Sequence, residues 1–117
     1  MAEWIEVATT NDLEKGTMQA VTAAGREIVL ARAGNSYYAA DNRCPHMGGQ
    51  LAKGELNGTI VTCPVHGSQF DLSNGEIVRW LRKSGVLEKL SKSVKPPRPL
   101  TVYNLKVEGN KVLVEIK

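Results

Sequence analysis

The sequence is poor in side chains that commonly build sites and cores: its 117 residues include two Cys, two His and 5% aromatic residues. Aliphatic side chains must therefore form most of the core of what this length predicts to be one domain, residues 1–117. No apolar run approaches the roughly 18 residues that a membrane span needs. Acidic Glu3 and Glu6 stand where a secretory signal would carry basic residues, so the sequence predicts a cytoplasmic protein.

Positive charge is concentrated in one segment of the chain. The net charge is +3, yet residues 79–98 alone hold seven Lys or Arg against a single acid, Glu88. The segment predicts either a docking surface for an acidic redox partner or a solvated helix with an apolar face against the body. Nucleic-acid binding is a poor fit, because Trp80 is the only aromatic residue in this segment.

Short strand-like runs between turn residues make up most of the remaining chain. Turn pairs such as Gly25-Arg26, Gly34-Asn35 and Asn57-Gly58 separate them. The predicted strands are Trp4–Ala8, Met18–Ala23, Glu27–Arg32, Ser36–Ala40, Thr59–Thr62, Gln69–Leu72, Glu76–Val78, Thr101–Val107 and Lys111–Ile116. Many short strands at close spacing predict an all-β fold, a small antiparallel sandwich or barrel.

Two stretches break the strand pattern. Residues 42–76 are rich in Gly and Pro and contain every Cys and His, so we expect two loops with hairpin strands that form a site. Apolar residues recur at helical intervals within residues 81–94, at Leu87, Leu90 and Val94. We therefore predict a short helix here, within a basic insertion over residues 80–98.

The whole supply of Cys and His falls in two matched arms. The first arm is Cys44-Pro45-His46 and the second, after sixteen residues, is Cys63-Pro64-Val65-His66. Thiolate and imidazole are ligands for iron–sulfur clusters, zinc or copper, and not for calcium or magnesium. Spacers of one and two residues let both ligands of each arm reach one metal site. The pattern therefore predicts a metal centre on Cys44, His46, Cys63 and His66.

The ligand types alone leave the metal open. Zinc accepts two Cys and two His, although zinc fingers usually separate a Cys pair from a His pair. A binuclear cluster with two Cys on one iron and two His on the other fits if the arms interleave. A single thiol nucleophile would leave the second arm without a role. Gly48, Gly49 and Gly67 stand beside the ligands, where the backbone must approach closely.

The stretch around these ligands resembles the Rieske iron–sulfur domain. The two-part motif reads Cys44-Pro45-His46-Met47-Gly48 and Cys63-Pro64-Val65-His66-Gly67-Ser68-Gln69-Phe70-Asp71-Leu72-Ser73-Asn74-Gly75. The resemblance implies a β base carrying a cluster-binding subdomain, at about residues 42–76, that holds one 2Fe–2S cluster. It implies Cys44 and Cys63 on the inner iron, and His46 and His66 on the outer iron, near solvent.

Residues beside the ligands place the chain within that family. High-potential Rieske proteins of respiratory complexes carry two further Cys in a disulfide, whereas Gly49 and Val65 occupy the matching positions here. Those proteins also use a Ser and a Tyr to donate hydrogen bonds to cluster sulfurs; Ser68 is present, but Phe70 replaces the Tyr. The missing hydroxyl predicts a midpoint in the lower half of the roughly −150 to +300 mV Rieske range. Pro64 stiffens the second loop.

The resemblance implies an electron carrier and not an enzyme in its own right. A flavin-dependent reductase would supply single electrons, and an oxygenase such as a ring-hydroxylating dioxygenase would accept them. No His remains for the mononuclear iron site of an oxygenase subunit. Two alternatives stay open: a small subunit of a larger reductase of the nitrite reductase type, and a structural domain that binds zinc through the same residues.

Overall fold

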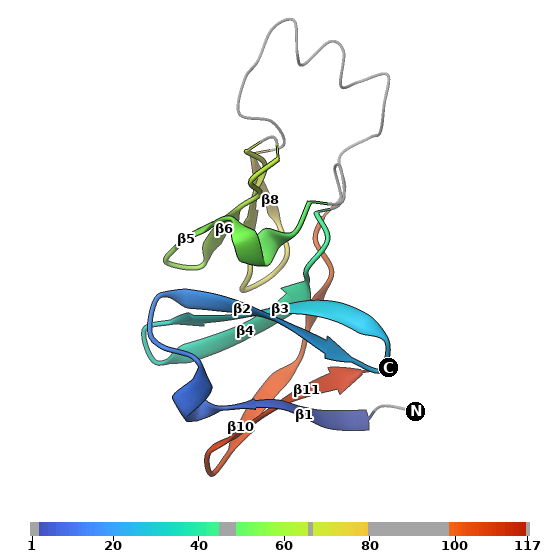
Figure 1. Ribbon diagram of the computed structural model, residues 1–117. Coiled ribbons are helices and arrows are strands. Elements are labelled where there is room, and N and C mark those ends of the chain that lie inside the picture. The colour runs from blue at the N-terminus through green and yellow to red at the C-terminus, as the bar shows by residue number, and fades with distance from the viewer. Residues whose placement is uncertain (1–2, 45–48, 66, 80–98, 117) are drawn as a thin grey trace, which may run out of the picture.

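In a computed structural model, residues 3–44, 49–65, 67–79 and 99–116 are described. Within these ranges the chain forms strands and two short 3-10 helices, arranged as three antiparallel layers (Figure 1). The outer layer of the base has the order β1-β11-β10, with bounds Glu3–Thr9 for β1, Lys111–Ile116 for β11 and Leu105–Glu108 for β10. The 3-10 helix η1, Thr10–Asp12, follows β1.

The middle layer lies between the other two in Figure 1. Its order is β2-β3-β4-β9, with bounds Thr17–Ala23, Arg26–Ala33, Ser36–Asp41 and Val102–Tyr103. In β3, Ile28 and Leu30 belong to the core shared with the outer layer, while Val29 and Ala31 belong to the core shared with the third layer. Because neighbouring side chains of a strand point to opposite faces, the central residues 28–31 of β3 form an apolar run that is buried on both sides.

The third layer is a small sheet of four short strands. Its order is β5-β6-β7-β8, with bounds Glu55–Asn57, Ile60–Thr62, Gln69–Asp71 and Ile77–Arg79. The 3-10 helix η2, Leu51–Lys53, leads into it. Val61, Phe70 and Leu72 are buried in the core that joins this sheet to β3 and β4. The small sheet is thus fixed on the base by apolar packing, about 1.5–3 kcal/mol for a fully buried side chain such as Phe70.

The predicted all-β antiparallel class is confirmed, although the strands differ locally from the predicted ones. The predicted strand Thr101–Val107 is divided at Asn104, because β9 pairs with β4 whereas β10 pairs with β11. The pair Asn57↔Ile60 closes the first hairpin of the small sheet, so its turn residues are Gly58-Thr59 and not Asn57-Gly58. Gly58 has φ +62°, which glycine adopts without strain, and this favours it at the first turn position. The predicted helix in residues 81–94 lies outside the described residues.

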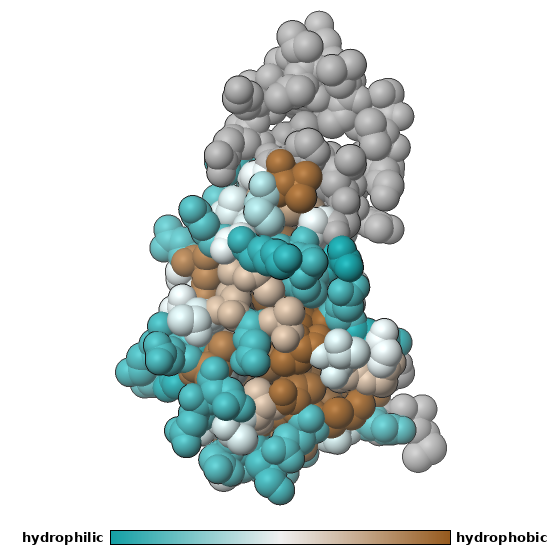
Figure 2. Space-filling view, viewed as in Figure 1, coloured by the Kyte–Doolittle hydropathy of each residue, from teal (hydrophilic) through white to brown (hydrophobic). Residues whose placement is uncertain are grey.

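Polar side chains cover much of the face in Figure 2, with hydrophobic side chains gathered over the central part of the molecule. Large hydrophobic side chains are nevertheless exposed on several elements, at Trp4, Val65, Val78, Val102 and Val107. Single exposed residues of this kind are normal for a folded protein. Within the described part of the chain, no helix has the length and apolarity to cross a membrane.

Candidate metal centre

The first arm is a loop whose base is paired across residues 42–51. The backbone N–H of Cys44 donates to the carbonyl oxygen of Gly49 (N···O 2.8 Å), and Arg43 forms an antiparallel bridge with Gln50. One step further out, the N–H of Leu51 donates to the carbonyl oxygen of Asn42 (2.8 Å). The described residues on either side of the first arm therefore pair with each other between β4 and η2, with Cys44 at the neck of the arm.

Buried Asn42 anchors this first arm to the base. Its side-chain Oδ1 accepts a hydrogen bond from the N–H of Ala52 (2.8 Å), and its own N–H donates to the carbonyl oxygen of Glu27 on β3 (3.0 Å). Asn42 is 1% exposed, so these bonds satisfy polar groups that would otherwise be costly to bury. Nothing in the residue pattern indicated this role for Asn42.

The second arm is closed in the same way. The N–H of Cys63 donates to the carbonyl oxygen of Ser68 (2.8 Å), and the N–H of Gly67 donates back to the carbonyl oxygen of Cys63 (3.0 Å). The next pair outward is Thr62↔Gln69, between β6 and β7. In both arms, therefore, a cysteine N–H binds the carbonyl five residues later, and each predicted His stands in sequence between the two closing residues.

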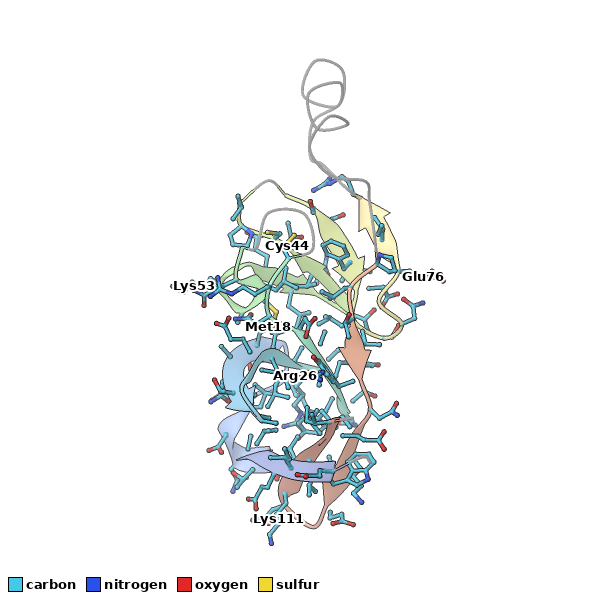
Figure 3. All side chains as sticks on the ribbon, turned by 90° about the vertical axis from the view of Figure 1, so that its right-hand side faces the viewer. Met18, Arg26, Cys44, Lys53, Glu76 and Lys111 are labelled. Carbon is cyan, nitrogen blue, oxygen red and sulfur yellow. The ribbon has the colours of Figure 1, made fainter. Side chains whose placement is uncertain are left out.

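The two cysteines come together in one buried site. Cys44 is 3% exposed and Cys63 is 2% exposed, both belong to the core between the small sheet and β3–β4, and neither forms a disulfide. A Cβ built on Gly49 would lie 2.9 Å from Sγ of Cys63. The sulfur of the second arm therefore lies directly against the closing residue of the first arm. In Figure 3, Cys44 lies in the upper part of the molecule, opposite the end that carries Lys111.

The other predicted site residues are buried, exposed or outside the described residues. Gly67, Ser68 and Phe70 are buried, the latter two completely, whereas Pro64 is exposed. His46, His66 and Gly48 lie outside the described residues. Because both His are among them, the described residues contain no group of three metal-binding side chains. The donor set nevertheless fits an iron–sulfur cluster: two buried thiol side chains from separate arms, with a glycine where a larger residue would fill the space.

Hydrogen bonds fix the charged groups below the arms. Hydrogen bonds from Arg43 Nε and Nη2 (2.8 and 3.0 Å) hold the pKa of Glu27 below its ordinary value, and Arg43 is next to Cys44 in sequence. The hydroxyl and then the N–H of Ser73 donate to Asp71 Oδ1 (2.6 and 2.9 Å) and lower the pKa of that carboxyl. Asp71 therefore stays ionised and stabilises the turn between β7 and β8.

At the end of β4, a further bond connects the neck of the first arm to β9. The hydroxyl of Tyr103 donates to the carboxylate of Asp41, the residue before Asn42. Burial and then this hydrogen bond raise the pKa of Tyr103, so the phenol remains protonated and able to donate.

A basic side chain that the sequence pattern grouped with the charged segment contacts the second arm. Nε and Nη2 of Arg79 both donate to the carbonyl oxygen of Gly67, at 3.2 and 3.1 Å. Arg79 ends β8 and pairs with Gln69 across the sheet, which directs it toward the arm. The pairing of β8 with β7 places Arg79 beside the second arm, and the sequence pattern alone did not indicate this position.

A buried thiol pair between two closed loops, on an all-β body, defines a small metalloprotein of the iron–sulfur or zinc class. The Rieske [2Fe-2S] domain profile matches residues 3–112. The ferredoxin component of the naphthalene 1,2-dioxygenase system of Pseudomonas putida is 26% identical over 114 residues, which cover 97% of this chain and 96% of the relative.

Two solved structures are similar over nearly the whole chain. The ferredoxin of carbazole 1,9a-dioxygenase from Nocardioides aromaticivorans IC177 has a TM-score of 0.78 and 26% identity, covering 95% of both chains. A complex of reduced oxygenase and oxidized ferredoxin in carbazole 1,9a-dioxygenase contains a chain with a TM-score of 0.75 and 27% identity, covering 95% of this chain and 91% of that one. This chain therefore belongs to the Rieske [2Fe-2S] domain family, and its cofactor is one Rieske-type 2Fe–2S cluster.

The closeness of Gly49 and Val65 gives a prediction for a paired substitution. A Cβ on Gly49 would lie 3.3 Å from Cβ of Val65, near the 3.5–4.5 Å range of disulfides. We expect Gly49→Cys with Val65→Cys to form a bridge between the arms and to slow cluster loss, since closing such a loop contributes about 3 kcal/mol. Thiol titration checks whether the bridge forms, and the rate at which the visible absorbance of the cluster is lost in guanidinium checks whether cluster loss is slower.

Each single cysteine variant is the control, because it alters the same position without closing the loop. Equal thiol counts before and after oxidation of the double variant would contradict the placement of these two residues.

Proposed function

We propose that this protein is an electron carrier whose cluster is held by Cys44, His46, Cys63 and His66. The observation that carries the proposal is the matched closure of two loops, each with a buried cysteine at its neck. Both sulfurs belong to one core, so two thiolates reach a single centre. The cluster supplies uptake and release of one electron. We further infer that residues 42–76 act as its binding subdomain within one domain, residues 1–117.

The burial of the cysteines supports different positions for the thiolate and imidazole ligands. With Cys44 and Cys63 buried, the thiolates suit the inner iron, and His46 and His66 suit the outer iron. Pro64 and Val65 of the second arm are exposed, so the loop that precedes His66 borders solvent. A partner would then approach this end of the molecule to exchange an electron. Thiolate ligands are retained in a reducing compartment, which supports a cytoplasmic location.

We infer that an oxygenase accepts the electron and that a flavin-dependent reductase supplies it. The naphthalene and carbazole dioxygenase ferredoxins, similar to this chain along nearly its full length, support an oxygenase as acceptor. The chain then performs no catalysis alone and acts as a component of an oxidoreductase system. The basic docking surface proposed for residues 79–98 lies, apart from Arg79, outside the described residues.

A redox titration followed by electron paramagnetic resonance tests the proposed function. We expect a reduced-state signal with the lowered average g value of a His-ligated 2Fe–2S centre, at a midpoint in the lower half of the Rieske range. A purified protein with zinc and no such signal would instead support the structural zinc domain. A normal signal without electron transfer to any oxygenase preparation would remove the carrier role but keep the cluster.

Substituting Ser68 tests whether its hydroxyl raises the midpoint potential of the cluster. Ser68 is fully buried and its carbonyl oxygen accepts the N–H of Cys63, so the backbone of Ser68 lies beside a predicted ligand. A hydroxyl that donates to cluster sulfur stabilises the reduced state. We expect Ser68→Ala to keep the cluster and to lower its midpoint in the same titration. Ser73→Ala, which removes an exposed hydroxyl bonded to Asp71, should leave the midpoint unchanged; equal midpoints in both variants would contradict the role of Ser68.

A further inference from the structure

Arg79 is connected to the second arm by an unusual pair of contacts. Two nitrogens of one guanidinium, Nε and Nη2, converge on a single carbonyl oxygen, that of Gly67, at 3.2 and 3.1 Å. The side chain is partly buried, so these bonds are partly shielded from solvent. Hydrogen bonds from charged donors are stronger than those between neutral groups. The contact therefore restrains the carbonyl that it reaches.

The restrained carbonyl is part of the turn that carries Cys63. Gly67 donates its own N–H to the carbonyl oxygen of Cys63, and its φ of +77° is one that glycine tolerates. It follows His66 in the chain and precedes buried Ser68. Arg79, on β8, thus contacts the turn between two predicted site residues. These are His66, an expected ligand, and Ser68, whose hydroxyl is expected to donate a hydrogen bond to a cluster sulfur.

The charge of Arg79 is not neutralised by a described carboxylate. Among the described residues, the ion pairs Arg43–Glu27 and Lys106–Glu108 do not include Arg79. A reduced cluster held by the two arms would carry one negative charge more than the oxidised cluster. A fixed cation beside the turn stabilises that charge by Coulomb attraction, more strongly in a partly buried setting than in water.

We propose that Arg79 is a positioning residue of the second arm and that its charge raises the midpoint potential. The proposal rests on the proposed function, since it requires the cluster to be held by this arm. Arg79 is not itself a ligand in this role; it acts through the peptide of Gly67 and through its electrostatic field.

Three substitutions separate the charge from the hydrogen bonds. Arg79→Gln removes the charge and leaves one nitrogen that can donate. Arg79→Lys keeps the charge but cannot donate from two nitrogens to the carbonyl oxygen. Arg79→Ala removes both the charge and the donors. We expect Gln and Ala to lower the midpoint measured by redox titration, whereas Lys keeps most of it. We expect Ala and Lys to lose the visible absorbance of the cluster about tenfold faster in guanidinium.

Arg32 provides a matched control in the base. It is also partly buried, and its Nε and Nη1 donate to backbone carbonyl oxygens, those of Gly34 (3.2 Å) and Leu13 (3.1 Å). Arg32→Gln therefore makes the same change of charge and a similar loss of bonds in the middle layer, away from the small sheet. It should leave the midpoint near that of the wild type.

The outcomes distinguish this proposal from the function on which it rests. If the wild type gives the normal signal and the midpoint of Arg79→Gln shifts no further than that of Arg32→Gln, only the role of Arg79 is overturned. A wild type without the signal would overturn both. If Arg79→Gln retains no cluster, the Arg79→Lys variant decides. A midpoint equal to that of the wild type, together with a faster rate of cluster loss, supports the proposal. A lowered midpoint with an unchanged rate of cluster loss overturns it.

Discussion

Cys63→Ser should yield a protein without the cluster, with iron and sulfide contents near zero. A serine hydroxyl is a poor replacement for a thiolate, and Cys63 is buried where, among the described residues, only Cys44 offers a second thiol. Cys44→Ser should have the same result. Because a bound metal centre links both arms, its loss should also increase amide exchange within residues 42–76. Metal analysis, visible spectra and hydrogen exchange measure these effects.

Val65→Ser is the matched control for this experiment. It introduces the same side chain two residues away, at a position that is 49% exposed. We expect it to retain the cluster and its spectrum. An intact, spectroscopically normal cluster in Cys63→Ser would refute the assignment of the site and, with it, the proposed function.

Gly75→Ala should strongly destabilise the protein. Gly75 has φ +81°, and a Cβ there would lie 2.2 Å from the carbonyl oxygen of Leu100, a backbone atom that cannot rotate away. The carbonyl oxygen of Gly75 also accepts the N–H of Leu100 (2.9 Å), which joins the small sheet to the returning chain. We expect a loss of about 2–5 kcal/mol in the free energy of unfolding, from the positive φ and the steric clash together.

Gly58→Ala separates those two causes. Gly58 lies in another turn of the same sheet, with φ +62° and no atom within 4 Å of a built Cβ. It should lose only the cost of the backbone conformation, about 1–2 kcal/mol. Guanidinium unfolding followed by circular dichroism measures both variants. Equal losses in the two would mean that the chain shifts freely at Leu100 and that the contact with Gly75 is not tight.

The strands could be predicted well from local patterns because their causes are local. In the last strand, Val112, Val114 and Ile116 alternate with more exposed residues, and the structure buries those three. The division of the preceding strand at Asn104 could not be predicted in this way. It depends on which distant strands pair on either side, β4 before the break and β11 after it.

The predicted ligand set rests on composition, since four scarce residues in two matched arms are typical of a metal centre and rarely arise by chance. Roles of non-ligand residues were harder to predict. Arg79 counted as one cation among several until the sheet placed it opposite Gln69, within reach of Gly67. Asn42, buried and bonded to Ala52 and Glu27, has no neighbour in sequence that signals its function.

The sequence by itself determined the all-β class and the family, because strand periodicity and ligand spacing are properties of neighbouring residues. The tertiary structure decided how the two arms meet: Sγ of Cys63 lies against Gly49, fourteen positions earlier in the chain, and the small sheet is fixed to β3 by a shared core. It also decided that residues 28–31 of β3 are buried on both faces of the strand. Such features depend on contacts between residues far apart in the chain, which form only when burial of apolar surface brings the layers together.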